Sequence, residues 1–315
     1  MRTFAAIMKQ LIIIVLLTAM AAACSQSYEE TKRLNRAERY RLWQEDSAAF
    51  KVAVMPTLDC MPLYVARELG LFDSLGVKVR LKPFTAQMDC DTALAGGSVE
   101  AAVTDLVRAE RLVGQGTPLR YVAATNAYWQ LVTNRTARIR QLKGLDDRMV
   151  AMTRYSVTDL LADAAVDSAR LKPERVFRIQ VNDVHIRFRM LQDNIMDALL
   201  LTEPLATAAR MAHHAVVLDT REMDASFGVI ACREKALEPS ARQEQLKLVM
   251  KAYNQACDLL NRQGVAAYGE LMSRCCGVKR EVADSLPKSI RFSHAAEPRQ
   301  QDIERARAWL KQKDS

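Results

Sequence analysis

The sequence predicts an α/β protein with two lobes and a helical C-terminal region. Apolar strand patterns alternate with helical patterns from residue 50 onward, which is typical of α/β architectures. The alternation occurs in two successive stretches, and 315 residues are enough for two lobes. From residue 240 onward the pattern is largely helical. Hydrophobic residues make up 50% and charged residues 26% of the chain, which favours a globular protein over a disordered one.

The first stretch begins with alternating apolar residues over 50–54, which predict a strand. A helix is expected over residues 62–69, because Pro62 suits a first turn and Gly70 suits the position after a helix end. A second strand over 77–81 would then pair in parallel with the first, with the helix as the crossover. The further elements expected here are helices over 89–95 and 106–113 and strands over 101–103, 119–124 and 131–133.

The second stretch repeats this organisation. A strand over 149–152 leads into a helix over 156–169, which Ser156 is suited to cap with Asp159 three residues later. The other elements expected are strands over 176–179, 195–200, 216–218 and 227–231, a helix over 185–192, and an amphipathic helix near the C-terminus over 303–310.

The N-terminus has the features of an export signal. Arg2 and Lys9 provide a positive start, residues 11–17 are apolar, and small residues lead to Cys24. Residues 21–24, Ala-Ala-Ala-Cys, resemble a bacterial lipobox, although Leu is usual where Ala21 stands. The resemblance implies a signal peptide over 1–23 and a diacylglyceryl group on Cys24, with palmitate-type acyl chains giving stable attachment to the cell envelope. An ordinary signal peptide with an incidental cysteine is the alternative.

The segment that follows the lipobox, residues 24–48, is polar and rich in charge. A lipidated tether is the simple interpretation. Four apolar or aromatic side chains in it could instead form a short helix that lies on the folded body, namely Leu34, Tyr40, Leu42 and Trp43.

Charge and motifs exclude several classes of function. The net charge of +8 falls to +6 without Arg2 and Lys9, and the basic residues are scattered among acidic ones, so we expect no nucleic-acid partner. The chain has no GxSxG, HExxH or P-loop motif, and its histidines have no partner at a catalytic or metal-binding spacing. We therefore expect that the protein is not an enzyme and that it has no catalytic residues, no cofactor and no metal site.

Six cysteines follow Cys24, and their pairing is left open by the sequence. An exported protein could form disulfides, but six cysteines allow 15 connectivities and the spacing selects none. Buried free thiols are the favoured interpretation. The residues are Cys60, Cys90, Cys232, Cys257, Cys275 and Cys276.

Four segments together resemble the periplasmic binding proteins of the taurine, alkylsulfonate and thiamine-precursor type. They are residues 56–72, 95–105, 191–204 (with Asn194 where Gly is usual) and the helical tail that contains Trp309. The resemblance implies a two-lobed type II periplasmic-binding-protein fold. A first lobe is expected from residues 49–130 and 208–315 and a second from 131–207, with the chain crossing between them near 125–135 and 203–212.

The same resemblance implies a solute-binding lipoprotein of an ABC importer, with an ABC permease as its partner and the membrane reached through the lipid anchor. Two alternatives stay open. The chain could be a scaffold or surface lipoprotein without a transport role, or an enzyme on the same fold, because fold alone does not settle function.

Candidate ligand-binding residues follow from where such folds bind ligands, beyond the carboxyl ends of the strands. The candidates are Asp59, Thr104, Asp105, Trp129, Tyr155, Ser156 and Glu203. Most have a structural alternative: the aspartates could instead cap helices or line turns, Ser156 could instead be a plain helix cap, Trp129 could instead pack in the core, and Glu203 could instead serve the hinge and a helix start. Asp59 and Asp105 favour a nitrogenous solute, whereas a helix start at Ser156 would suit a sulfonate or another anion. We favour the nitrogenous solute at this point.

Overall fold

The computed structural model describes residues 35, 36, 38–41, 44 and 46–313, in two units, residues 1–49 and Phe50–Ser315. In the first unit, the described residues up to 48 are helical. Among all described residues, no helix is both long and apolar enough to cross a membrane. The predicted signal peptide, the lipidation of Cys24 and much of the predicted tether lie outside the described residues.

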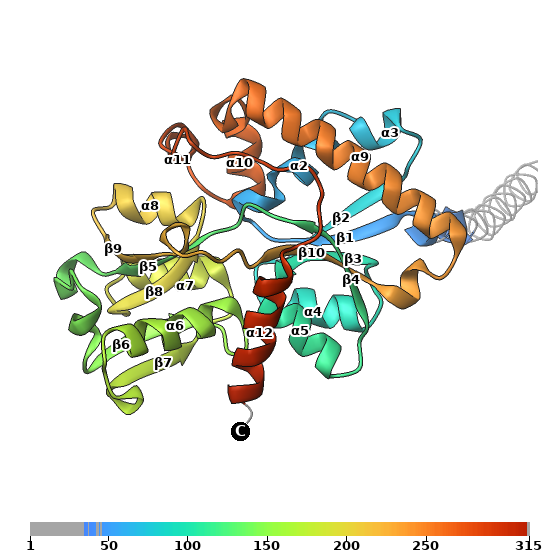
Figure 1. The fold of residues 1–315 in the computed structure, drawn as a ribbon. Coiled ribbons are helices and arrows are strands. Elements are labelled where there is room, and N and C mark those ends of the chain that lie inside the picture. The colour runs from blue at the N-terminus through green and yellow to red at the C-terminus, as the bar shows by residue number, and fades with distance from the viewer. Residues whose placement is uncertain (1–34, 37, 42–43, 45, 314–315) are drawn as a thin grey trace, which may run out of the picture. The chain divides into compact units, whose positions relative to one another are not determined.

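The second unit contains two mixed five-stranded sheets, which confirms the predicted two-lobed α/β architecture (Figure 1). The first sheet has the order β2-β1-β3-β10-β4, with β1 parallel to β2 and β3, and with β10 antiparallel to β3 and β4. Its strands are β1 (Phe50–Val54), β2 (Val79–Pro83), β3 (Ala101–Asp105), β4 (Leu119–Ala124) and β10 (Gly228–Arg233).

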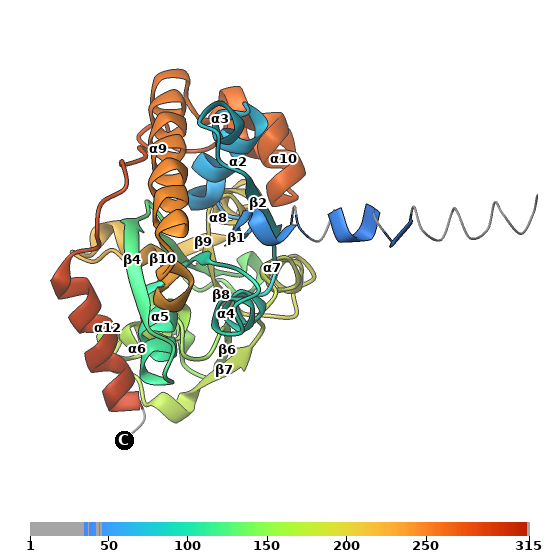
Figure 2. The ribbon, with the colours of Figure 1, turned by 90° about the vertical axis from the view of Figure 1, so that its right-hand side faces the viewer.

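Helices cover both faces of this first sheet. The helices α2 (Met61–Glu68) and α9 (Ser240–Gln263) lie on one face, and α4 (Gln87–Ala95) and α5 (Leu106–Gly114) on the other (Figures 1 and 2). The predicted boundaries of α2 are close to those observed. Pro62 stands in its first turn, and Gly70 has a φ of 65°, a left-handed conformation that glycine adopts without strain. The short helix α3 (Leu71–Ser74) begins immediately after Gly70.

The second sheet has the order β7-β6-β8-β5-β9. Its strands are β5 (Trp129–Thr133), β6 (Arg148–Met152), β7 (Val176–Gln180), β8 (Ala198–Thr202) and β9 (Ala215–Asp219), and its helices are α6 (Val157–Ser168), α7 (Val184–Gln192) and α8 (Leu205–Met211). We call residues 50–124 and 228–313 lobe 1 and residues 129–219 lobe 2.

The chain crosses between the sheets twice, over residues 125–128 and 220–227. The first crossing falls in the predicted region, but the second does not lie near 203–212. The reason is that β9 pairs antiparallel with β5, so the second sheet extends to Asp219 rather than ending by residue 207. An apolar strand pattern predicts a strand but does not identify its neighbour.

Helices complete lobe 1, as predicted from the pattern after residue 240. They are α9, α10 (Gly269–Cys276), α11 (Arg280–Asp284) and α12 (Gln300–Lys313). Seven short 3-10 helices occur in the described chain: Leu58–Cys60, Arg135–Ala137, Leu142–Leu145, Pro173–Arg175, Thr220–Glu222, Glu234–Leu237 and Val265–Tyr268. The six cysteines in the described part of the chain are free thiols, five of them buried and Cys275 half-buried.

The last helix, α12, contacts both lobes. Arg307 Nε lies 2.5 Å from Glu110 Oε2 of α5 in lobe 1, while Trp309 Nε1 donates to Asp163 Oδ2 of α6 in lobe 2 over 2.9 Å. Lys313 Nζ also lies 3.0 Å from Asp163 Oδ2. Figure 1 shows α12 lying in front of α5 and beside α6. The C-terminal helix therefore links the lobes at a place distant in sequence from both crossings.

Candidate functional site

A cavity of about 50 Å³ lies between the two lobes. Its wall includes side chains that follow β1 and β3 in lobe 1, and side chains of β8, α7 and α8 in lobe 2. This is the position at which α/β folds bind ligands, beyond the carboxyl ends of their strands. Since a single water needs roughly 10–15 Å³ of such a cavity, the volume suits a small molecule or a small group of a larger one.

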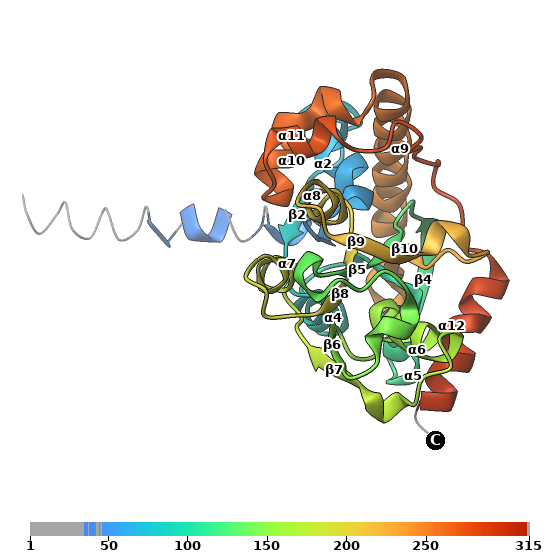
Figure 3. The same ribbon diagram turned by 90° about the vertical axis from the view of Figure 1, so that its left-hand side faces the viewer.

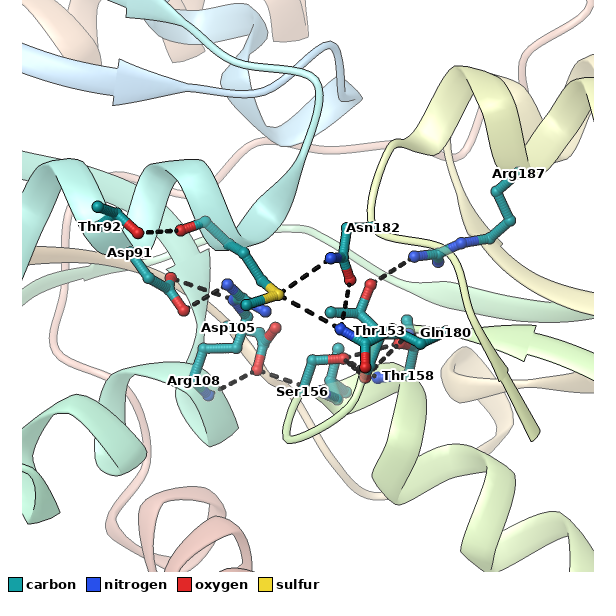
Figure 4. Close-up of polar contacts among 12 residues, drawn as sticks. Asp91, Thr92, Asp105, Arg108, Thr153, Ser156, Thr158, Gln180, Asn182 and Arg187 are labelled. Carbon is teal, nitrogen blue, oxygen red and sulfur yellow. Dashed lines mark hydrogen bonds and ion pairs between the residues drawn. The ribbon is translucent and has the colours of Figure 1, made fainter.

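Arg187 provides a buried positive charge in this wall. Its side chain extends from α7 toward Thr153 at the end of β6 (Figure 4). Two of its nitrogens donate to the Val181 carbonyl, Nε over 3.0 Å and Nη2 over 2.6 Å. Nη2 also donates to Thr153 Oγ1 over 2.6 Å, and Nη1 donates to the Leu200 carbonyl over 3.0 Å. The second N–H of Nη1 has no acceptor among the described residues.

No carboxylate of the described chain pairs with Arg187, although the side chain is only 2% exposed. Burial, together with the positive charge of Arg108, lowers the pKa of Arg187 to about 10. The guanidinium therefore stays protonated at neutral pH, and the cavity wall carries a positive charge that forms no ion pair with a described carboxylate. An unpaired buried charge is unfavourable, and a bound anion would relieve that cost.

Arg108 lines the cavity from lobe 1 and has a carboxylate partner. Its Nε donates to Asp91 Oδ1 of α4 over 3.1 Å, and its Nη2 contacts Asp91 Oδ2. Burial raises the pKa of Asp91, and the charge of Arg108 opposes that shift. The pair therefore contributes little net charge, which leaves Arg187 as the dominant charge that lines the cavity.

Asp59 lies in the same wall and is 6% exposed. Its Oδ2 accepts a hydrogen bond from Thr125 Oγ1 over 3.1 Å, and no basic side chain of the described residues forms an ion pair with it. Burial raises the pKa of Asp59, and hydrogen bonds from Thr57 and Thr125 oppose that shift. Burial without a cation favours the neutral carboxyl over the charged form.

Asp105 does not line the cavity but joins the lobes beside it. As the N-cap of α5, its Oδ1 accepts from the backbone N–H of Arg108 over 3.0 Å, and the same oxygen accepts from the N–H of Val157, the first residue of α6, over 3.1 Å (Figure 4). Burial raises the pKa of Asp105 to about 7. Its Oδ2 is buried and has no hydrogen-bond partner among the described residues.

Ser156 caps α6, as its sequence position predicted. Its Oγ accepts from the N–H of Thr158 over 3.1 Å and donates to the Thr153 carbonyl over 2.7 Å, while Asp159 Oδ2 accepts from the N–H of Tyr155 over 3.0 Å. Asp105 and Ser156 therefore accept hydrogen bonds from the N–H groups of Val157 and Thr158, the first two residues of α6. In this arrangement an anion cannot use the helix start without displacing Asp105.

The other predicted residues divide into two groups. Thr104 and Trp129 line the cavity. Tyr155 instead stacks against Arg111, whose guanidinium carbon lies 4.0 Å from the centroid of the tyrosine ring. Glu203, which is 1% exposed, accepts from Tyr128 Oη over 2.7 Å and pairs with Arg210 Nη2 over 2.7 Å, so it connects the first crossing to α8.

Sequence reasoning missed both arginines of the cavity. The available signal for Arg187 was its position on the buried face of α7, between Val184 and Leu191 at helical spacing. A charged residue on such a face must find partners in the interior. The signal could not identify those partners, because they come from β6, β8 and the loop after β7.

The lobes also contact each other around Thr85 and Met88. Thr85 Oγ1 donates to Asp183 Oδ2 over 2.5 Å, and the N–H of Val184 donates to the Thr85 carbonyl over 3.0 Å. Met88 Sδ accepts from the side-chain amides of Gln180 and Asn182, which Figure 4 shows next to each other. With the Asp105–Val157 bond, these contacts join the two lobes beside the cavity, and we call this arrangement, in which the lobes touch, closed.

Comparison with solved structures supports the fold. The alkanesulfonate-binding protein SsuA from Xanthomonas axonopodis pv. citri, bound to MOPS, is 16% identical, with 84% of this chain and 91% of that chain covered and a TM-score of 0.71. The aliphatic sulphonate binding protein SsuA from Escherichia coli is 16% identical, with 85% and 88% covered and a TM-score of 0.69. The nitrate-binding protein NrtA from Synechocystis PCC 6803 is 15% identical, with 81% and 74% covered and a TM-score of 0.67.

Sequence comparison places the chain more directly. No curated protein sequence matches it. The model of the family described as NMT1/THI5 like matches residues 57–263, which is more than half of the chain and includes most of both lobes. The match also contains Asp59, Arg108 and Arg187. This chain therefore belongs to the NMT1/THI5-like family.

Proposed function

We propose that this protein is the solute-binding component of an ABC importer and that it holds a small anionic solute between its lobes. The observation that carries the anion is Arg187, a buried guanidinium in the cavity wall with no carboxylate partner among the described residues. The two-lobed fold, the family and the sulfonate and nitrate binders with the same fold support the importer role. The lipobox supports a lipid anchor at Cys24 in the cell envelope and a membrane permease as partner.

A nitrogenous solute, which the sequence favoured, has less support. Burial raises the pKa values of Asp59 and Asp105 and so favours their neutral forms, and Asp105 already accepts two backbone hydrogen bonds. Arg187 keeps its charge at neutral pH. The electrostatics of the cavity therefore favour an anion over an amine.

The two lobes give a mechanism for capture. A solute that contacts Arg187 of lobe 2 and Arg108 of lobe 1 binds the closed arrangement better than an open one, so it shifts the population toward closure. Contacts that already join the lobes, such as Thr85 with Asp183, lower the free energy that the solute must supply. The closed form would then present both lobes to the permease.

Thermal unfolding of the purified protein with small anions and small amines tests this proposal. Nitrate, formate, methanesulfonate and methylphosphonate are compared with methylammonium and guanidinium at matched ionic strength. A solute at 100 times its Kd raises the free energy of unfolding by about 2.7 kcal/mol, which a thermal shift detects. We expect at least one anion, and no amine, to stabilise the protein.

Two substitutions locate the effect. Arg187→Gln should abolish the anion-dependent shift, and Arg187→Lys should retain part of it because the charge stays. Lys172→Gln, which removes an exposed charge elsewhere on lobe 2, is the matched control and should leave the shift intact. An anion site at Arg187 would be contradicted if only amines stabilise the protein, or if anions stabilise Arg187→Gln as much as the wild type. If no solute stabilises the protein, the scaffold alternative is favoured.

A further inference from the structure

A second and larger cavity lies on another face of the protein, with a volume of about 490 Å³. On one side it is lined by α7 and α8 of lobe 2, and on the other by α11 and the residues between α10 and α11 in lobe 1. Figure 3 looks onto α7, α8, α10 and α11 on this side of the molecule. Leu205 is the one residue that lines both this cavity and the interlobe cavity. The two cavities are therefore adjacent but have different walls.

The charged side chains of this second cavity all have one sign. Arg189 of α7 and Lys279 before α11 are exposed and basic, His185 lies with them, and no aspartate or glutamate lines the cavity. Neither Arg189 nor Lys279 forms an ion pair with another described residue. By contrast, Arg280, the neighbour of Lys279, pairs with Glu270 over 2.8 Å. The lining of the cavity therefore carries positive charge without any acidic side chain to offset it.

The rest of the lining is apolar. Phe188, Met211, Val278 and Val282 contribute side chains to it. Met211 is 44% exposed, although it is a large hydrophobic residue. Ligand sites of 300–1,000 Å³ usually combine an apolar wall with a few charged groups, and exposed methionines adapt to varied apolar partners. The composition suits a ligand with an apolar body and an anionic head.

The two walls approach closely at His185 and Gly277. A Cβ placed on Gly277 would lie 3.0 Å from Cε1 of the His185 ring, and Gly277 has a φ of 66°, so glycine is favoured there on both grounds. The histidine of lobe 2 therefore packs against the backbone of lobe 1 at one edge of the cavity. A ligand bound here would contact both lobes.

We infer that this second cavity is a binding site for an amphiphilic anion. Its anionic head lies near Arg189 and Lys279, and its apolar body lies against Phe188, Met211 and Val278. A free fatty-acid-like molecule and an anionic lipid share this chemistry. The inference does not depend on the solute proposed for the interlobe cavity, because Arg187 is absent from this wall.

Isothermal titration of the purified protein with decanoate, below its micelle concentration, tests the site. Decyltrimethylammonium, which has the same chain length and the opposite charge, is the matched ligand control. Arg189→Glu combined with Lys279→Glu should weaken decanoate binding at least tenfold. Arg140→Glu combined with Lys172→Glu changes the net charge equally at exposed positions elsewhere on lobe 2 and should leave it within twofold.

Two further variants separate this site from the interlobe cavity and from a pure charge effect. Arg187→Gln should bind decanoate normally, whereas Met211→Gln should weaken binding several-fold because it places a polar group against the apolar body.

Flotation with phosphatidylglycerol or phosphatidylcholine vesicles distinguishes a membrane lipid from a free amphiphile as the ligand. Binding to phosphatidylglycerol vesicles that requires Arg189 and Lys279 would identify a lipid, and decanoate binding without flotation a free amphiphile.

Three results would overturn the inference. One is decanoate affinity that is unchanged in the Arg189→Glu, Lys279→Glu variant. Another is equal affinity for decyltrimethylammonium, and the third is the absence of binding to both decanoate and phosphatidylglycerol vesicles. Because the two substituted residues are exposed, the double variant should keep its thermal unfolding midpoint, which shows that lost binding is not lost folding.

Discussion

The carboxylate of Asp105, at the end of β3 in lobe 1, accepts a hydrogen bond from the backbone N–H of Val157 at the start of α6 in lobe 2, over 3.1 Å. The same oxygen caps α5 through the N–H of Arg108. One side chain thus ends a strand, starts a helix and joins the lobes. Its second oxygen is buried without a partner among the described residues, so ionisation of this group is costly.

Asp105 should make the stability of the protein depend on pH. Burial raises its pKa from 3.8 to about 7 in the folded state, so the folded protein binds a proton more tightly than the unfolded chain does. The stabilising proton is present at low pH and is lost as pH rises, so this group lowers the free energy of unfolding between about pH 4 and 7. In Asp105→Asn, urea unfolding should show a smaller decrease over this range. An unchanged pH profile would exclude the assignment.

The contacts of α12 should favour the closed arrangement. Trp309→Phe removes the N–H that donates to Asp163, and Lys313→Ala removes the cation next to Asp159 and Asp163. We expect the double variant to lose about 1–2 kcal/mol of unfolding free energy and to have a larger radius of gyration in solution scattering. Gln312→Ala, an exposed neighbour, is the control. An unchanged radius together with unchanged stability would show that α12 does not hold the lobes.

Glu203 should be important for stability even if it does not touch the solute. Its carboxylate is buried and binds Tyr128 Oη, Arg210 Nη2 and the N–H of Thr207. Glu203→Gln weakens these charge-assisted bonds, and we expect a loss of about 1–3 kcal/mol in unfolding free energy. Glu222→Gln, which alters an exposed acid within the second crossing, should change the unfolding free energy by less than about 0.5 kcal/mol. Equal effects of the two substitutions would contradict this role.

Cys275 should be the most reactive of the described thiols in the native protein. Burial raises the pKa of all six described thiols, but Cys275 is only half-buried, and Arg67, with Nη2 3.5 Å from its Sγ, opposes the shift. With a thiol reagent, one described cysteine should react quickly, and the rest only after unfolding. Cys275→Ser should remove the fast phase. A fast phase that persists in this variant would place the reactive thiol elsewhere.

Local sequence determined the elements of this fold. Pro62 and Gly70 delimit α2, and Ser156 caps α6, because turn geometry and capping depend on residues only a few positions apart. The alternation of strand and helix patterns likewise determined the α/β class, since the periodicity of apolar residues differs between a strand and a helix. The candidate residues Asp59, Thr104 and Trp129 follow from the same reasoning, and they line the interlobe cavity.

Tertiary structure decided which distant groups meet. Arg187 obtains its environment from Thr153, 34 residues away, and Asp105 reaches Val157 across 52 residues. The pairing of β9 with β5, which places the second crossing at 220–227, likewise depends on contacts between distant parts of the chain. Side-chain charge and apolar periodicity are properties of the local chain, whereas the partner that neutralises a charge or pairs with a strand edge depends on how the lobes pack. The sequence alone therefore predicted a two-lobed fold with candidate residues between the lobes, whereas the proposal of an anion depends on how the lobes pack around Arg187.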